Sequence, residues 1–195
     1  MASFEILNSE LRIKKSLTKL DKFVIGTIKI IEKYADYVII SGYVSIFFGR
    51  ARATEDVDIF ISGVSKENFN KLYSEALSKG YEFNIDNPEE LFNEYLKAGL
   101  SINLWEKNFP LIRLEIKFTK NLSQQLSIKN KIKVYYNGDF LYFTPIEYQI
   151  IYKRVILKSD KDLEDARHLE IVFKNLNEKV MEDYKKLVIK EFNDE

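Results

Sequence analysis

The sequence has no cysteine and a single histidine, His168, among its 195 residues. The absence of cysteine excludes disulfides, thiolate nucleophiles and cysteine-ligated zinc, and one histidine cannot build a multi-histidine metal site. No apolar run approaches the roughly 20 residues of a membrane-spanning helix, and the first residues lack the apolar core of a signal peptide. These absences predict a cytoplasmic protein without a membrane segment.

An excess of one charge is also absent, because thirty Lys and Arg residues balance thirty Asp and Glu residues. No overall basic field indicates nucleic acid or membrane as a partner, although a local basic groove is compatible with this balance. Hydrophobic residues make up 46% of the chain, enough for one well-packed core. Repeats and linkers rich in Gly, Ser or Pro are missing. Two organisations stay open: a core of residues 1–125 followed by a hairpin and C-terminal helices in residues 126–195, or one compact unit.

The hydrophobic periodicity alternates between strand and helix patterns along the chain. Strands are predicted at residues 37–40, 56–61, 101–105, 112–118, 132–136 and 140–143, and helices at residues 16–34, 44–48 and 66–79, through Leu91 and Tyr95, and from Pro145 onward. Asn137-Gly138 between the last two strands is typical of a type I′ hairpin turn. We therefore predict an α/β or α+β fold, a mixed sheet backed by helices, with a C-terminal helical segment that closes one side of a cleft.

Two acids, Asp56 and Asp58, stand one residue apart on a predicted strand, so their side chains point the same way. Paired carboxylates are the hard oxygen ligands that Mg²⁺ prefers, and paired ions serve phosphoryl and nucleotidyl transfer. The Asp-x-Asp pattern alone also occurs in metal-dependent glycosyltransferases and on solvated strand faces. The residues around it must decide between these interpretations.

The preceding residues favour a nucleotide. Ser41-Gly42-Tyr43 forms a small-residue turn at the start of a short predicted helix, where backbone N–H groups and the helix dipole favour a triphosphate. An anion site and a cation site then lie at the same edge of the sheet. A nucleotide bound through magnesium needs both.

The stretch from Ser41 to Asp58 resembles the DNA polymerase β-type nucleotidyltransferase superfamily, and Gly49, Arg52, Thr54, Asp56 and Asp58 resemble its small prokaryotic branch related to abortive-infection and toxin-antitoxin enzymes. The resemblance implies a nucleotidyltransferase fold in which the turn contacts triphosphate and the acids hold two Mg²⁺ ions, with Mn²⁺ as an alternative. Ser41 stands where the family usually has its first glycine, and Tyr43 follows Gly42, so the turn departs from both common forms.

The resemblance also implies a third carboxylate, for which Glu115 on the strand at residues 112–118 is the best candidate, as metal ligand and as a base for the acceptor. The alternative is that Glu115 only pairs with Arg113 or Lys117 on a solvated face. By the same analogy Lys153 contacts phosphates, with a solvated helix face as its alternative. Arg52 and Thr54 either reach phosphate or steady the loop, and His168 is interpreted as structural.

The function implied is metal-dependent transfer of a nucleoside monophosphate from a nucleoside triphosphate to a hydroxyl of RNA, protein or a small molecule, in the manner of a toxin-antitoxin component with a protein partner. The alternative is a non-catalytic nucleotide-binding or antitoxin-like module of the same fold. The residues Lys129, Lys131, Lys133, Tyr135 and Tyr136 form a basic and aromatic strip that suits RNA, or simply a lysine-rich surface strand. The sequence leaves the acceptor and the oligomeric state open.

Overall fold

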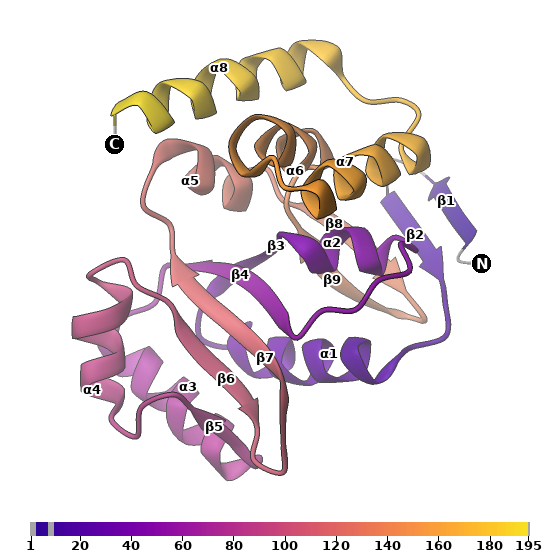
Figure 1. The fold of residues 1–195 in the computed structure, drawn as a ribbon. Coiled ribbons are helices and arrows are strands. Elements are labelled where there is room, and N and C mark those ends of the chain that lie inside the picture. The colour runs from indigo at the N-terminus through magenta and orange to yellow at the C-terminus, as the bar shows by residue number, and fades with distance from the viewer. Residues whose placement is uncertain (1–2, 8–9, 195) are drawn as a thin grey trace.

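A computed structural model describes residues 3–7 and 10–194 of the chain, with side chains described from residue 11 onward. Nine strands form one mixed sheet in the order β1-β2-β8-β9-β3-β4-β7-β6-β5 (Figure 1). The strands are β1 (Ser3–Leu7), β2 (Glu10–Lys14), β3 (Asp36–Ile40), β4 (Asp56–Ser62), β5 (Tyr81–Phe83), β6 (Ile102–Glu106), β7 (Phe109–Phe118), β8 (Ile132–Tyr136) and β9 (Asp139–Phe143). The strand pair β8–β9 lies inside the sheet, between β2 and β3, so residues on both sides of position 125 share one sheet.

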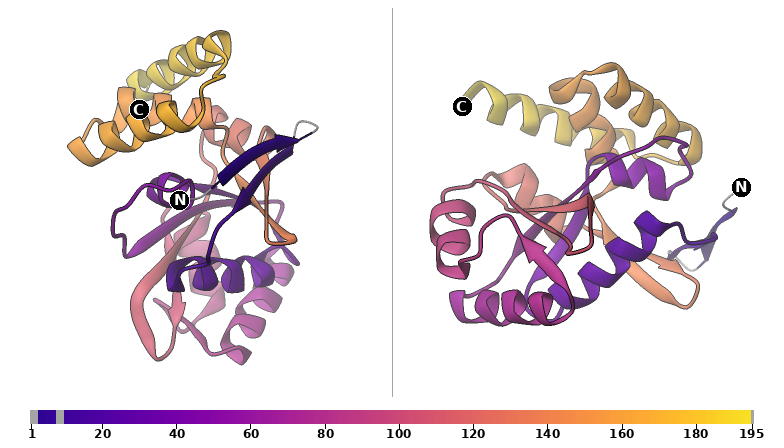
Figure 2. Two further views of the ribbon diagram at one scale, coloured as in Figure 1. Left: turned by 90° about the vertical axis from the view of Figure 1, so that its right-hand side faces the viewer. Right: turned by 60° about the horizontal axis from the view of Figure 1, so that its bottom comes forward.

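The helices cover the sheet in two groups (Figures 1 and 2). They are α1 (Lys19–Ile31), α2 (Gly42–Phe47), α3 (Lys66–Ser78), α4 (Pro88–Glu90), α5 (Leu122–Lys129), α6 (Ile146–Tyr152), α7 (Asp160–Val172) and α8 (Glu178–Asp194), with π-helical turns η1 (Leu91–Leu96) and η2 (Lys153–Leu157). Helices α1 and α3 lie below the sheet in Figure 1 and α6, α7 and α8 form a layer above it, whereas α5 packs on the face of β3 and β4 opposite the main core. This C-terminal layer faces the edge of the sheet at which β3 ends and β4 begins.

Alternation along β4 separates a core face from an open face. Val57, Ile59 and Ile61 are each at most 1% exposed and belong to the main hydrophobic core. The residues between them point to the other face, where Phe60 packs with Ile128 of α5 in a small second cluster. Burial of one apolar face fixes the register of the strand, because a slip by one residue would bring aspartates into the core.

The prediction of a mixed sheet backed by helices with a C-terminal helical segment is confirmed. The hairpin prediction is also confirmed, since Asn137 and Gly138 both have positive φ, 45° and 87°. The sequence interpretation missed β1, β2, β5 and α5, which are short or have a weak periodic pattern. Within the described residues, no helix is long and apolar enough to cross a membrane.

Helix α1 begins with a buried polar network that links it to α2. Thr18 and Asp21 form a capping box, in which the Thr18 hydroxyl accepts from the Asp21 N–H and the Asp21 carboxylate accepts from the Thr18 N–H. The same carboxylate, 1% exposed, accepts from the Tyr43 hydroxyl at 2.7 Å and pairs with Lys15 at 3.0 Å. Asp21 therefore ties the start of α1 to the helix that follows the Ser41 turn.

The substitution Asp21→Asn is expected to lower the free energy of unfolding by about 2–4 kcal/mol, because it removes a buried, multiply bonded charge. Burial raises the pKa of Asp21, but the Thr18 N–H, the Tyr43 hydroxyl and Lys15 together lower it by more. The pKa of Asp21 in the folded protein is therefore below the ordinary 3.8. Because the pKa of Asp21 is depressed in the folded protein, its charge stabilises the fold fully at any pH above the pKa of the unfolded state. This stabilisation is lost as the pH falls through the pKa of the folded state. Urea unfolding should show a full difference between wild type and variant at pH 7 and a shrinking one below about pH 4. A difference that stays constant would contradict this account.

Candidate functional site

The acid pair lies on the open face of β4, beside the parallel strand β7. The register places Asp56 opposite Arg113 and Asp58 opposite Glu115. Because side chains alternate between faces, Lys117, two residues after Glu115, shares that face. The sheet thus brings two acids of one strand together with an acid and two cations of the next.

The carboxylates are paired with these cations. Asp56 accepts from the Arg113 Nε at 3.0 Å, in a half-exposed ion pair. The Lys117 Nζ lies 2.8 Å from the Glu115 Oε1 and 3.5 Å from the Asp58 Oδ1. The Asp58 side chain is only 19% exposed, so its carboxylate has lost much of its water and depends on this lysine for compensation.

Burial sets the direction of the pKa shifts at this site. Burial raises the pKa of Asp58, and the nearby Glu115 raises it further, whereas Lys117 and the Ser41 hydroxyl lower it by less. Burial also raises the pKa of Glu115, but hydrogen bonds from Lys117 and Ser101 lower it to a net value below its ordinary one. Burial lowers the pKa of Lys117, and the two acids more than reverse this. The lysine therefore stays charged between them.

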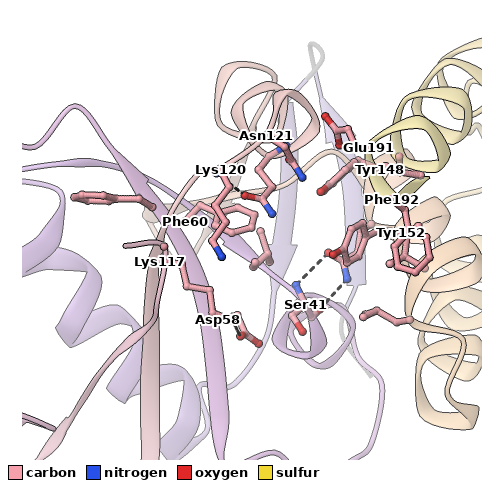
Figure 3. A pocket seen from close by; sticks show the side chains of 18 residues that line it. Ser41, Asp58, Phe60, Lys117, Lys120, Asn121, Tyr148, Tyr152, Glu191 and Phe192 are labelled. Atoms are coloured by element: carbon pink, nitrogen blue, oxygen red, sulfur yellow. Dashed lines mark hydrogen bonds and ion pairs between the residues drawn. The ribbon is translucent and has the colours of Figure 1, made fainter. Parts of the chain in front are cut away.

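A cavity of about 440 Å³ opens beside Asp58 (Figure 3). One wall consists of Lys117 together with Lys120 and Asn121, from the segment that leads into α5. The opposite wall is aromatic, with Tyr148 and Tyr152 of α6 and Phe192 of α8, which Figure 3 shows across the opening from the lysines. Ser41 lies between the two walls. The cavity combines a cationic side, an aromatic side and a partly buried carboxylate.

The Ser41 turn is held by the C-terminal layer. Ser41 has φ 62° and ψ −141°, a conformation that glycine adopts readily and other residues adopt at a cost of about 1–3 kcal/mol. The buried Gln149 of α6 compensates with two bonds, accepting from the Ser41 N–H and donating to the Ser41 carbonyl, both at 3.1 Å. This pairing explains how a serine occupies a backbone conformation that glycine adopts more readily.

Gly42 and Tyr43 have different positions from those expected of a phosphate loop. A Cβ on Gly42 would lie 1.9 Å from the Arg52 guanidinium, so any larger residue there would displace that side chain from its bonds to Asp165. The Tyr43 ring is fully buried and its hydroxyl bonds Asp21, away from the cavity. Of the three turn residues, only Ser41 lines the cavity beside Asp58.

The other three residues expected to bind nucleotide take part in intramolecular contacts. Arg52 donates two bonds of 3.2 Å to Asp165, and the Thr54 hydroxyl donates to the Asp56 carbonyl at 2.9 Å. Lys153 is fully buried, with its ammonium 2.7 Å from Asp162 and 2.9 Å from Asp165. The expected phosphate contact of Lys153 needs correction, because this ammonium does not line the cavity and is already bonded to two carboxylates. Arg52 braces the segment before β4 against α7, Thr54 bonds within that segment to the start of β4, and Lys153 ties η2 to α7.

The three acids are not assembled as a ready metal site. Within the described residues, no three histidine or acidic side chains converge closely enough to hold an ion. Asp56 turns toward Arg113, and Lys117 stands between Asp58 and Glu115. Asp58 and Glu115 are nevertheless register partners on adjacent strands, and the Lys117 ammonium lies against both carboxylates. Two partly buried acids on neighbouring strands are stabilised by a cation between them, so their chemistry fits a hard divalent ion once the lysine moves.

The basic and aromatic strip forms a ladder on β8 and β9. Lys133 lies 3.9 Å from the ring centroid of Phe140, and Lys131 lies 4.2 Å from that of Tyr142. Tyr136, in contrast, is 3% exposed and belongs to the core. Cation–π contacts within the chain account for the two lysines, and Tyr136 has no free face for RNA.

The comparisons with known proteins are sparse. No protein-family model matches the chain, and no curated protein matches it. Among solved structures, it is similar to the crystal structure of an antigenic nucleotidyltransferase-like protein from Paracoccidioides brasiliensis, with 17% identity and a TM-score of 0.49 over 78% of this chain and 74% of that one. So distant a likeness carries no inference about the site, which has to be interpreted from its own geometry.

Several cavity residues escaped prediction from the sequence. Lys117 had a signal, because alternation places it on the same face as Glu115, but it was interpreted only as a surface partner. Gln149 and Tyr152 lie in a helix whose apolar pattern does not show which face meets the cavity. Lys120 had no periodic signal, since it precedes α5 in a loop.

The substitution Lys153→Met should test the bracing role. Removing a fully buried ammonium leaves Asp162 without its lysine partner, and we expect a loss of about 3 kcal/mol in the free energy of unfolding. Lys174→Met, an exposed lysine after α7, should change it by less than about 0.5 kcal/mol. Binding of a magnesium nucleotide by folded Lys153→Met, measured by calorimetry, should equal that of wild type. Selective loss of binding with unchanged stability would return Lys153 to the nucleotide site.

Proposed function

We propose that the protein is a metal-dependent nucleotidyltransferase, which moves a nucleoside monophosphate from a nucleoside triphosphate to a hydroxyl acceptor. One observation carries the proposal: Asp58, Ser41 and Lys117 share a cavity that has cations on one wall and aromatic rings on the other. A nucleotide presents the complementary pair of features, an anionic phosphate chain and a flat base.

The phosphate chain fits the wall that contains Lys117 and Lys120, by charge. The base fits the opposite wall, where Tyr152 packs against the buried Tyr148 at a centroid distance of 5.7 Å and Phe192 is 61% exposed at the opening. Stacking on such rings tolerates any base, because every base has a π-face. This arrangement directs the phosphates toward Asp58 at the end of the sheet.

Asp56, Asp58 and Glu115 are the residues that would hold Mg²⁺ or Mn²⁺. In such enzymes two bound ions activate the attacking oxygen and neutralise the leaving pyrophosphate. In the proposed reaction the acceptor oxygen forms a bond to the α-phosphorus while the bond to the β-phosphate oxygen breaks. Glu115 lies beside Asp58 across the two strands and would be the group that takes the acceptor proton. The chain thus contributes mainly position and charge.

The rival proposal is a nucleotide-binding module, of antitoxin-like type, that keeps the site without its reaction. One observation favours it, since Lys117 and Arg113 pair with the acids that would hold the ions. The acceptor, whether RNA, a protein side chain or a small molecule, and a role with a toxin or antitoxin partner, belong to the proposal and have to be found by experiment.

Substitution of the acid pair separates the two proposals. Asp58→Asn and Asp56→Asn are each expected to reduce transfer at least 100-fold, on the order of the loss when one group that stabilises transition-state charge is removed. The assay offers α-labelled nucleoside triphosphates with total RNA, cell protein and aminoglycosides, and follows the label. Asp183→Asn, an exposed acid on α8, is the matched control and should retain full transfer.

The result expected of the binding module is different. In that case wild type transfers no label in any mixture, yet calorimetry detects nucleotide. If wild type and Asp58→Asn bound the nucleotide equally well, with or without magnesium, neither proposal could include a metal-dependent site at Asp58.

The aromatic wall supports a second prediction on nucleotide affinity. Tyr152→Leu removes a ring that faces the cavity and should weaken nucleotide binding by about tenfold, since stacking contributes about 1–3 kcal/mol per base. Tyr152→Phe keeps the ring and should bind as wild type does. Fluorescence titration with a labelled nucleotide measures both, and equal weakening of the two variants would show that the hydroxyl rather than the ring matters.

A further inference from the structure

Lys117 has a position that the proposed reaction does not explain. Its Nζ lies between two carboxylates from adjacent strands, 2.8 Å from Glu115 and 3.5 Å from Asp58, and its side chain also lines the cavity. Its side chain is 35% exposed, so it is only partly enclosed by its neighbours.

The two acids need this charge because of how the sheet presents them. They are register partners across β4 and β7, so their distance is set by the strand spacing and not by a flexible loop. An uncompensated pair of carboxylates at that distance would repel in a partly buried setting. The neighbouring Asp56 is compensated in the same way, by Arg113. The strand β7 therefore supplies one acid of the site, Glu115, and the two cations that pair with the acids of both strands.

A divalent ion and the Lys117 ammonium cannot both occupy the space between these acids. An ion bound to carboxylate oxygens lies about 2.0–2.1 Å from each oxygen when it is Mg²⁺, which is within the region that the ammonium fills. Two cations there would repel, and the cavity that Lys117 and Lys120 both line offers the lysine a place away from the acids.

We propose that Lys117 is a resident cation that competes with a divalent ion for Asp58 and Glu115, and that it leaves them to contact the phosphates when a metal-bound nucleotide enters the cavity. That the phosphates belong to a nucleotide rests on the proposed function, whereas the competition between Lys117 and a metal ion does not. Metal and nucleotide then bind cooperatively, because the nucleotide offers the displaced ammonium a new partner.

The test measures Mn²⁺ binding to the purified protein by the paramagnetic resonance of the free ion, without an acceptor and without turnover. Lys117→Met should bind Mn²⁺ about tenfold more tightly than wild type, in the range of ordinary coupling between sites. Lys120→Met removes a charge from the same cavity wall, with no ion pair to these acids, and should stay within about twofold of wild type. Lys117→Arg keeps a cation and should retain the weak binding of wild type.

A second measurement repeats the titration with a non-hydrolysable nucleoside triphosphate. Wild type should gain Mn²⁺ affinity when the nucleotide is present, and Lys117→Met should gain much less, because its acids are already free. Lys117→Gln serves in place of the Met variant if that chain does not fold, as judged by circular dichroism and thermal unfolding.

The outcomes distinguish this inference from the proposed function. The competition would be overturned if Lys117→Met bound Mn²⁺ no more tightly than wild type does. It would also be overturned if Lys120→Met gained as much Mn²⁺ affinity as Lys117→Met. Tighter binding by Lys117→Met in a protein that transfers no nucleotide would support the competition and count against the transferase.

Discussion

The parallel pairing of β4 with β7 is the constraint on which the site depends. It places Asp58 opposite Glu115 and Asp56 opposite Arg113, on the face of the sheet that the core does not use. Buried Val57 and Ile59 hold this register, because any slip would exchange apolar and acidic side chains between the faces. The distance between the two acids, and the need for a cation between them, follow from the sheet itself.

The C-terminal helices position the turn and the cavity wall beside the acids that the sheet presents. Gln149 holds the Ser41 turn in a conformation that serine adopts only at a cost, and Asp165 receives Arg52, whose guanidinium lies where a side chain on Gly42 would be. Tyr152 from the same layer forms the far wall of the cavity. Helices remote in sequence from the acids thus position the turn and shape the space beside it, so site geometry and stability of the layer are coupled.

The sequence predicted those parts of the molecule that local pattern controls. The alternation around Asp58 indicated which face it takes, and Asn137-Gly138 indicated the hairpin, because both follow from backbone geometry over a few residues. Lys153 is expected at phosphate only by analogy with the family that the sequence resembles, but its ammonium is held by Asp162 and Asp165 of α7. These ion pairs depend on how α7 packs against η2, which the hydrophobic periodicity of the sequence does not show.

The central claim is that metal and nucleotide meet at Asp58 and Glu115. The most direct measurement is a crystal structure with Mn²⁺ and a non-hydrolysable nucleoside triphosphate, with the ion located by its anomalous scattering. The account predicts an anomalous peak bound by Asp58, the base against Tyr152, and the Lys117 ammonium turned to the phosphates. A nucleotide bound in the cavity with Lys117 still between the two acids, and no ion beside them, would contradict it.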